Sequence, residues 1–253
     1  MNDNSRANGQ DDHTLAHTIA ERAGRRLVTL RGQAGIGDLR AIGDRSSHEF
    51  IVAELAAARP DDAVLSEEGA DDLARLRADR VWIVDPLDGT REYGEPGRTD
   101  WAVHVALWER GDLTAGAVAL PARDRVLSTA AVPVVPDAAP GPIRIAVSRS
   151  RAPRLVSGLA ELVDAELVPI GSAGAKVAAV VLGVVDAYVH AGGQYEWDSA
   201  APVAVARAAG LHTSRIDGSA LRYNRPDPLL PDLVVCRTEL AGRLLDGLVR
   251  TTG

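Results

Sequence analysis

The chain has 253 residues, of which 46% are hydrophobic and 25% charged, and its formal net charge is −7. This length can bury one large domain or two packed lobes. An acidic balance argues against a general nucleic-acid-binding surface, which needs clustered positive charge. An acidic protein can still bind a small phosphate ester if metal ions supply the missing positive charge.

The cysteine content and the N-terminus bear on the compartment. Cys236 is the single cysteine, which excludes an intramolecular disulfide and a thiolate metal cluster. The first dozen residues are polar, and no apolar run approaches the roughly 18 residues of a membrane span. We therefore expect a cytoplasmic protein that binds neither membranes nor nucleic-acid polymers.

The N-terminal third predicts two helices and a short strand. After a disordered segment at residues 1–10, apolar residues recur every three or four positions from Leu15 to Leu30, as in an amphipathic helix. A Gly-rich break follows at residues 32–37. Ser46 and Glu49 form a capping-box pattern, which predicts a second helix from there to Leu55. A short strand at residues 64–65 then runs into Glu67.

The middle of the chain predicts an antiparallel meander. An apolar strand at residues 81–84 ends in Asp85, and further strands are expected at 101–108, 113–120 and 125–130 because turn residues separate them. The Pro-rich stretch 131–142 is the best candidate for a linker. We therefore expect an N-terminal α+β lobe over residues 11–140 and a C-terminal α/β lobe over residues 141–253.

The sequence of the C-terminal lobe alternates between strand-like and helix-like patterns. Strands are expected at 143–147, 165–170, 185–190 and 232–236, with helices at 153–163, 174–183, 198–209 and 238–249. Such alternation is typical of a layered α/β structure.

The most informative segment is residues 82–90, where an apolar strand delivers two carboxylates to a Gly-containing turn. Asp85 and Asp88 would repel each other when buried, so we expect a cation beside them. Pro86 stiffens the turn so that the Leu87 carbonyl can serve as a third oxygen ligand, and Gly89 would let a phosphate approach the backbone. An ordinary polar turn after a strand has the same composition.

Two other acidic positions are weak signals when taken singly. Glu67 and Glu68 follow a short strand, where paired carboxylates are more often a solvated turn. Asp198 precedes a helix, where an aspartate is usually an N-cap.

Taken together, the segments SEEG at 66–69, DPLDGT at 85–90 and EWDSAA at 196–201 resemble the signature of the inositol monophosphatase-like phosphatases. The resemblance covers residues 11 to 250 and implies a five-layer α-β-α-β-α sandwich. It also implies two to three Mg²⁺ ions as cofactors, and these ions prefer hard oxygen donors. The implied ligands are Glu67, Asp85, the carbonyl of Leu87, Asp88 and Asp198.

The same resemblance assigns the chemical roles. Glu67 and Thr90 would orient a water for in-line attack on phosphorus. The family has a further aspartate near the second helix, where this sequence reads GDRSSHE at 43–49. Either Asp44 or Glu49 could take that role, and the capping-box pattern weighs against Glu49.

Residues 171–175 precede a helix, so their amides could hold an anion at its N-terminus. A glycine-rich connection would look the same. Lys176, in the first turn of that helix, is the single lysine among 28 basic residues. A lysine at this position favours the interpretation that a compact positive charge is required there. The alternative is that one lysine codon was retained by chance.

The resemblance narrows further to the 3'(2'),5'-bisphosphate nucleotidases, through VSRS at 147–150, GSAGAK at 171–176 and DGTREY at 88–93. Arg91, Tyr93, Arg151 and Ala173 depart from the usual pattern there, which makes the substrate less certain than the reaction class. The substrate-binding residues that it implies are Gly89, Thr90, Arg149, Ser172, Lys176, Glu196 and Asp198.

The leading hypothesis is Mg²⁺-dependent hydrolysis of the 3'-phosphate of adenosine 3',5'-bisphosphate in sulfate assimilation, with inhibition by lithium. Its rivals are an inositol or sugar phosphate as substrate, and a non-catalytic anion-binding module. The oligomeric state stays open, with a homodimer as one option. His104 is interpreted as a packed or edge-strand histidine.

Overall fold

The computed structural model describes residues 10–33, 38–149 and 153–252, and the account below is limited to them. The expected disordered segment at residues 1–10 lies outside the described residues apart from Gln10. Within the described ranges no helix is both long and apolar enough to cross a membrane.

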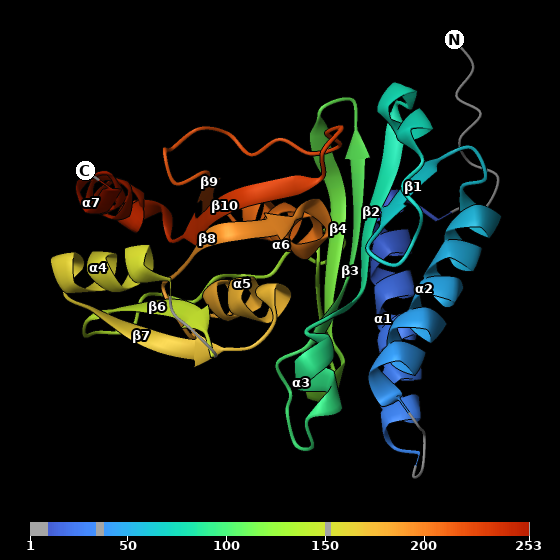
Figure 1. Cartoon of the computed structure of the whole chain (residues 1–253), viewed down its shortest axis with the longest axis horizontal. Coiled ribbons are helices and arrows are strands. Elements are labelled where there is room, and N and C mark those ends of the chain that lie inside the picture. The colour runs from blue at the N-terminus through green and yellow to red at the C-terminus, as the bar shows by residue number, and fades with distance from the viewer. Residues whose placement is uncertain (1–9, 34–37, 150–152, 253) are drawn as a thin grey trace.

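The chain folds into five layers, α-β-α-β-α, as the resemblance implied (Figure 1). Helices α1 (Asp12–Arg31) and α2 (Leu39–Ala58) cover the outer face of a first sheet. Helices α5 (Ala173–Val181) and α6 (Glu196–Ala208) lie between that sheet and a second one. Helices α4 (Arg154–Val163) and α7 (Ala241–Thr252) cover the far face of the second sheet.

The first sheet has the strand order β1-β2-β3-β4-β5, and β1 and β2 are its only parallel pair among the described residues. Antiparallel pairing of the last four strands confirms the predicted meander. The strand bounds are β1 Ala63–Ser66, β2 Arg80–Asp88, β3 Ala102–Glu109, β4 Asp112–Leu120 and β5 Arg125–Ser128. Three short helices adjoin them: η1 Leu73–Arg77, α3 Thr90–Gly94 and η2 Pro121–Arg123.

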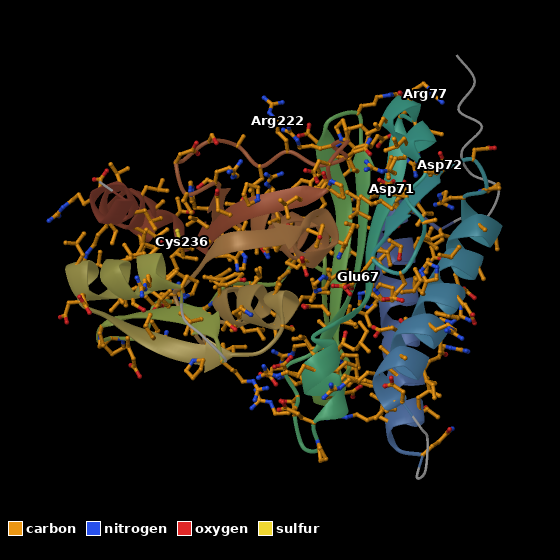
Figure 2. All side chains as sticks on the ribbon, in the orientation of Figure 1. Glu67, Asp71, Asp72, Arg77, Arg222 and Cys236 are labelled. Atoms are coloured by element: carbon orange, nitrogen blue, oxygen red, sulfur yellow. The ribbon has the colours of Figure 1, made fainter. Side chains whose placement is uncertain are left out.

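The second sheet has the order β7-β6-β8-β10-β9. Its bounds are β6 Ile143–Ser148, β7 Ala165–Ile170, β8 Ala187–Tyr195, β9 His212–Ser214 and β10 Leu229–Cys236, with a short η3 at Thr238–Leu240. The four predicted strands are confirmed, and the three-residue β9 was not predicted. Cys236 is fully buried near the junction of β10 and η3 (Figure 2).

Two of the predicted boundaries differ from the structure because the helix cap or the strand-pairing partner is a different residue from the one expected. Helix α2 begins at Leu39 because Asp38 caps it, so Ser46 and Glu49 lie in its interior and do not form a capping box. Strand β2 does not end at Asp85. It continues to Asp88, because Asp88 pairs with Ala102 after a register shift in the ladder to β3.

Candidate metal-dependent active site

The carboxyl end of β2 presents two aspartates on a bent stretch of strand. The register shift between Asp85 and Asp88 breaks the regular ladder, and the Leu87 amide donates to Asp85 Oδ1 at 3.0 Å. Thr90 Oγ1 donates to the Leu87 carbonyl oxygen at 3.1 Å. A bulge of this kind re-aims side chains, which brings both carboxylates to the same side of the sheet.

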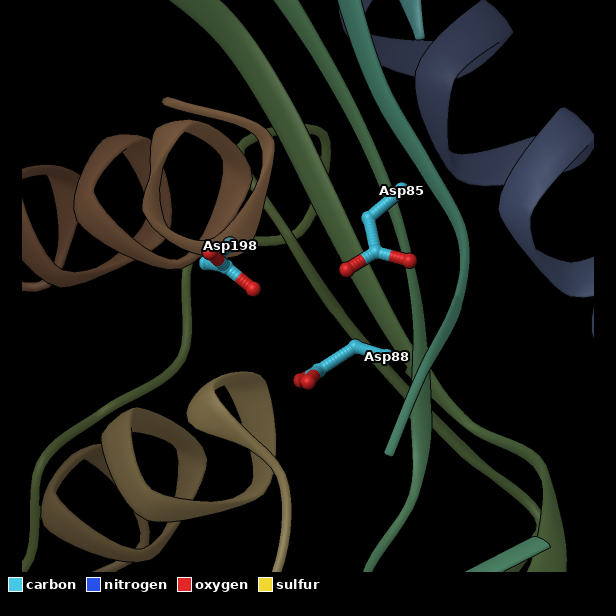
Figure 3. Close-up of side chains that lie close together, drawn as sticks. All are labelled: Asp85, Asp88 and Asp198. Atoms are coloured by element: carbon cyan, nitrogen blue, oxygen red, sulfur yellow. The ribbon is translucent and has the colours of Figure 1, made fainter. Parts of the chain in front are cut away.

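The third aspartate comes from α6, which lies between the two sheets. Asp198 lies in the first turn of α6 and its Oδ2 accepts a hydrogen bond from the Tyr195 amide at 2.6 Å. The helix therefore starts two residues earlier than predicted, and Asp198 is not its N-cap. The capping bond fixes the side chain on the face of α6 that looks toward β2 (Figure 3).

These three carboxylates meet in a compact cluster. One oxygen each of Asp85, Asp88 and Asp198 lie within 4.8 Å of one another, and the side chains converge on a shared space (Figure 3). Asp85 and Asp88 are buried. The expectation that separated acidic side chains meet in space is thus met for these three.

The electrostatics of the cluster call for a cation. Burial, followed by repulsion from Asp88 and Glu67, raises the pKa of Asp85 well above its ordinary value. Burial and repulsion from Asp88 raise the pKa of Asp198 to about 6. Asp88 differs, because contacts with His104 and the Gly174 amide outweigh its burial and lower its pKa. Hard oxygen donors with unbalanced negative charge fit a divalent ion such as Mg²⁺.

Glu67 joins the cluster from the turn after β1. Burial of its carboxyl group, followed by repulsion from Asp198, raises its pKa to about 7, and it shares a hydrogen bond with Asp85. The residue as a whole is exposed, so its carboxyl group lies at the rim of the cluster. That position is suited to a water between the metal centre and solvent.

Of the two acidic candidates on α2, Asp44 approaches the site. Its Oδ1 lies 3.5 Å from Thr90 Oγ1, and burial together with repulsion from Glu68 raises its pKa to about 7. Glu49 is exposed and is five residues further on, about 140° around the helix. Of the two alternatives, the geometry favours Asp44.

The backbone amides at the N-terminus of α5 bind carboxylates of the protein itself. The amides of Ala173 and Gly174 donate to Asp88 at 3.0 and 2.5 Å, and the Gly171 amide donates to Asp100 at 2.6 Å. The expected amide cradle for a ligand is therefore wrong for these three groups, because the carboxylates of Asp88 and Asp100 accept their hydrogen bonds. Ser172 caps the helix through the Ala175 amide.

Gly89 permits the close approach of the turn after β2 to the start of α5. Its φ of 84° is left-handed, and a Cβ there would lie 2.8 Å from the Cβ of Ser172. Glycine is thus required at this turn for the contact with Ser172 as well as for conformation.

Lys176 lies beside the cluster in a cavity of about 450 Å³ that Asp88 and Asp198 also line. Its ammonium donates to the carbonyls of Gly171 and Ser172 at 3.0 and 2.7 Å, and burial lowers its pKa. A larger cavity of about 630 Å³ lies between α1 and β5, away from the acidic cluster. The smaller one is the candidate substrate site because it adjoins the carboxylates.

Two predicted substrate residues have protein partners instead. Arg149 donates to Glu92 at 2.8 Å and to Glu95 at 2.9 Å. Glu196 is 1% exposed and accepts from the amides of Asn224 and Arg225 at 2.6 and 2.8 Å. The expectation that Glu196 lies near the sugar does not fit this geometry, because the amides of Asn224 and Arg225 already bind its carboxylate.

His104 is the residue whose importance the sequence interpretation missed. It is fully buried on β3, the central strand of its sheet, with Nε2 3.2 Å from Asp88 Oδ2 and Nδ1 3.0 Å from the Trp197 carbonyl. The packed interpretation is confirmed and the edge-strand alternative is wrong. The available signal was a polar residue among the apolar positions of a strand that pairs with residues 85–88.

Acidic side chains of β2 and α6 converge on a shared space beside a cavity, and such a cluster can hold a metal ion of the kind that enzymes use to hydrolyse phosphate esters. The model of the inositol monophosphatase family matches residues 12–251, and the chain belongs to that family.

Individual relatives narrow the comparison. The chain is 52% identical over 237 residues to a protein of Mycobacterium bovis named 3'-phosphoadenosine 5'-phosphate phosphatase, and the match covers 89% of each chain. It is 33% identical over 201 residues to the 3'(2'),5'-bisphosphate nucleotidase CysQ of Escherichia coli, covering 74% of this chain and 80% of that one. The crystal structure of CysQ from Bacteroides thetaiotaomicron superimposes with a TM-score of 0.79 at 28% identity, covering 90% and 98% of the two chains.

Proposed function

We propose that this protein is a Mg²⁺-dependent phosphatase that converts adenosine 3',5'-bisphosphate and water to AMP and phosphate. The observation that carries the reaction class is the convergence of Asp85, Asp88 and Asp198 from β2 and α6. The substrate is supported by the names of the relatives at 52% and 33% identity.

The residues divide between holding metal and handling protons. Glu67, Asp85, the Leu87 carbonyl, Asp88 and Asp198 would hold two to three Mg²⁺ ions. When bound, Mg²⁺ supplies Lewis acidity that makes water a better nucleophile and neutralises charge on the leaving oxygen. Glu67 and Thr90 orient the water, and Asp44 accepts a proton through Thr90, which its raised pKa favours.

The overall step balances without a covalent phosphoenzyme. The water oxygen bonds to phosphorus while the bond from phosphorus to the 3'-oxygen of the ribose breaks. One proton of the water ends on that 3'-oxygen, and the second stays with the released phosphate or the basic carboxylates.

The cavity beside the cluster would hold the nucleoside part of the substrate. Lys176 is its buried cation, and the amphipathic wall around Tyr188 and Tyr195 completes it. Ser172 and Gly89 lie where this cavity meets the metal centre. Arg149 would contribute to the second phosphate only by exchanging its contacts with Glu92 and Glu95.

The first test measures phosphate release from adenosine 3',5'-bisphosphate and from inositol 1-phosphate, with and without Mg²⁺. We expect Asp85→Asn to lose at least about 1,000-fold in kcat, since it removes metal and charge stabilisation of several kcal/mol. Asp246→Asn, on the exposed side of α7, is the control and keeps full activity. Full activity of the Asp85 variant would refute the metal assignment.

The same assay separates the rival functions. A large preference for inositol 1-phosphate in kcat/KM would replace the nucleotide by an inositol phosphate as substrate. No turnover of any phosphate ester, together with tight anion binding, would indicate the non-catalytic module.

Four further features belong to this proposal. We infer inhibition by Li⁺, a role in sulfate assimilation and a cytoplasmic location, and we retain a homodimer as one assembly to test. Phosphate release at millimolar LiCl and light scattering of the purified protein measure two of them directly.

A further inference from the structure

We propose that His104 is a positioning residue that sets the distance between two metal-binding carboxylates, Asp88 of the first lobe and Asp198 of the second. The inference rests on the proposed metal centre and concerns how this chain holds its ligands in place. It assigns no proton transfer to the histidine.

One imidazole ring contacts both ligand-bearing segments. Its Nε2 lies 3.2 Å from Asp88 Oδ2, and its Nδ1 donates to the carbonyl of Trp197, the residue directly before Asp198, at 3.0 Å. The span between the two nitrogens of a planar ring is fixed. The ring therefore fixes how far the first turn of α6 sits from the end of β2.

The ring itself is held rigidly. His104 pairs with Asp85 of β2 on one side and with Val118 of β4 on the other, so its backbone is fixed in the middle of the sheet. It is fully buried. Movement of α6 relative to β2 would have to break at least one of its two contacts.

Gly174 shows that the surroundings are shaped to admit this ring. A Cβ on Gly174 would lie 2.0 Å from His104 Nε2 and 3.0 Å from Asp88 Oδ2. The same glycine donates its amide to Asp88 Oδ2. A histidine that merely filled space would not need a neighbour without a side chain at the point where its nitrogen meets the carboxylate.

The first test measures Mn²⁺ binding to the substrate-free protein by electron paramagnetic resonance, which does not depend on turnover. We expect His104→Phe to weaken Mn²⁺ binding about 10- to 100-fold, as for other partners of metal ligands. His104→Gln can keep a donor near Asp88, and His104→Asn can keep one near Trp197. Each should lose less than the Phe variant.

The control is His212→Gln, because His212 lies on β9 and contacts Ser214 Oγ at 2.9 Å. It should bind Mn²⁺ as the wild type does. Wild-type affinity in a folded His104→Phe protein would overturn the proposal. If Asp85→Asn still abolishes binding in that case, the metal centre and the proposed function stand without it.

A second test uses Gly174 and covers the case in which His104→Phe does not fold. Gly174→Ala should weaken Mn²⁺ binding in the wild-type background by displacing the ring. It should have a much smaller effect in a His104→Ser background, where the space is free. Equal fold-changes in both backgrounds would show that the two residues are uncoupled and would refute the positioning role.

Discussion

At the scale of single residues, the main feature of the site is a group of acidic side chains that are buried away from water. Asp85 and Asp198 carry raised pKa values because burial and mutual repulsion favour their protonated forms. Such groups cluster at functional sites. A cation would relieve the repulsion, so the residues that destabilise the metal-free protein are the ones proposed to bind metal.

This arrangement predicts how the stability of the metal-free protein depends on pH. The pKa of Glu67 is about 7 and that of Asp198 about 6 in the folded protein, above their values of 4.5 and 3.8 in the unfolded chain. Between about pH 4 and 7 the folded state therefore holds more protons, so the free energy of unfolding falls as pH rises. Urea midpoints in EDTA at pH 5, 6 and 7 should decrease in that order.

Saturating Mg²⁺ should remove that decrease, because metal ligands must be deprotonated to bind. Carboxylates with lowered pKa values, such as Asp186 beside Arg144, act below about pH 4 and do not oppose the trend. A midpoint in EDTA that rises from pH 5 to 7 would contradict the assigned shifts.

The sequence was informative about which residues carry chemistry and less informative about what surrounds them. Asp85, Asp88 and Asp198 were identified as candidate metal ligands from short sequence motifs, because each motif is a local pattern. The contact of His104 with Asp88 and the contacts of Glu196 with Asn224 and Arg225 could not be identified in this way, because the residues that meet are distant in sequence.

At the scale of elements, β4 packs closely against α6. A Cβ on Gly116 would lie 2.6 Å from the Cβ of Ala204 and 3.2 Å from the Ala201 carbonyl. The small residues of α6 therefore allow the helix to lie directly on the sheet. That contact helps to place Asp198, which projects from the same helix.

Gly116→Ala should consequently destabilise the protein by about 1–3 kcal/mol, the usual cost of inserting a methyl group into a packed interface. The matched control is Gly242→Ala on α7, where a Cβ meets nothing within 4 Å. It should be neutral or stabilising by about 0.5–1 kcal/mol, because alanine favours a helix. Urea denaturation of both variants checks this, and equal midpoints would mean that the interface can relax.

Most helices and strands follow from hydrophobic periodicity, and the errors occur at their ends. The start of α2 depends on Asp38, whose side chain accepts from the Ala41 amide, while the Ser46 pattern is equally plausible by composition. The three-residue β9 was missed because a strand this short has too few positions to show alternation.

At the scale of the whole molecule, a buried arginine connects η1, beside the first sheet, with the segment that precedes β10 in the second sheet. Arg75 of η1 is 1% exposed and donates to Asn224 Oδ1 at 2.7 Å and to the Arg225 carbonyl at 2.8 Å. The amides of the same two residues bind Glu196 at the start of α6. A chain of contacts thus runs from η1 to the helix that carries Asp198.

Arg75→Met should lower the free energy of unfolding by about 1–3 kcal/mol, since buried acceptors lose their donors. It should also weaken Mg²⁺ binding, because α6 loses part of its support. Arg77→Met is the control, since Arg77 lies on the exposed side of η1 (Figure 2). Calorimetric titration with Mg²⁺ and urea denaturation measure the two effects. Wild-type values for both in the Arg75 variant would show that this connection is dispensable.

The division into lobes at residues 11–140 and 141–253 stays a prediction. The described structure has no helix or strand between Ser128 and Ile143, which agrees with the Pro-rich composition there. Yet the largest apolar core includes residues of both sheets with α5 and α6 between them. The layered order was predictable from element types, whereas this shared core depends on side chains that meet only after folding.

The solitary thiol has a practical consequence. Cys236 is wholly enclosed, and burial raises its pKa to about 12, so it is a poor nucleophile at neutral pH. A cysteine introduced on the exposed side of α7 would react with a maleimide dye almost alone. Together with a second introduced cysteine on α2, it would report the separation of the two outer helical layers by fluorescence, without any need to remove a native sulfur.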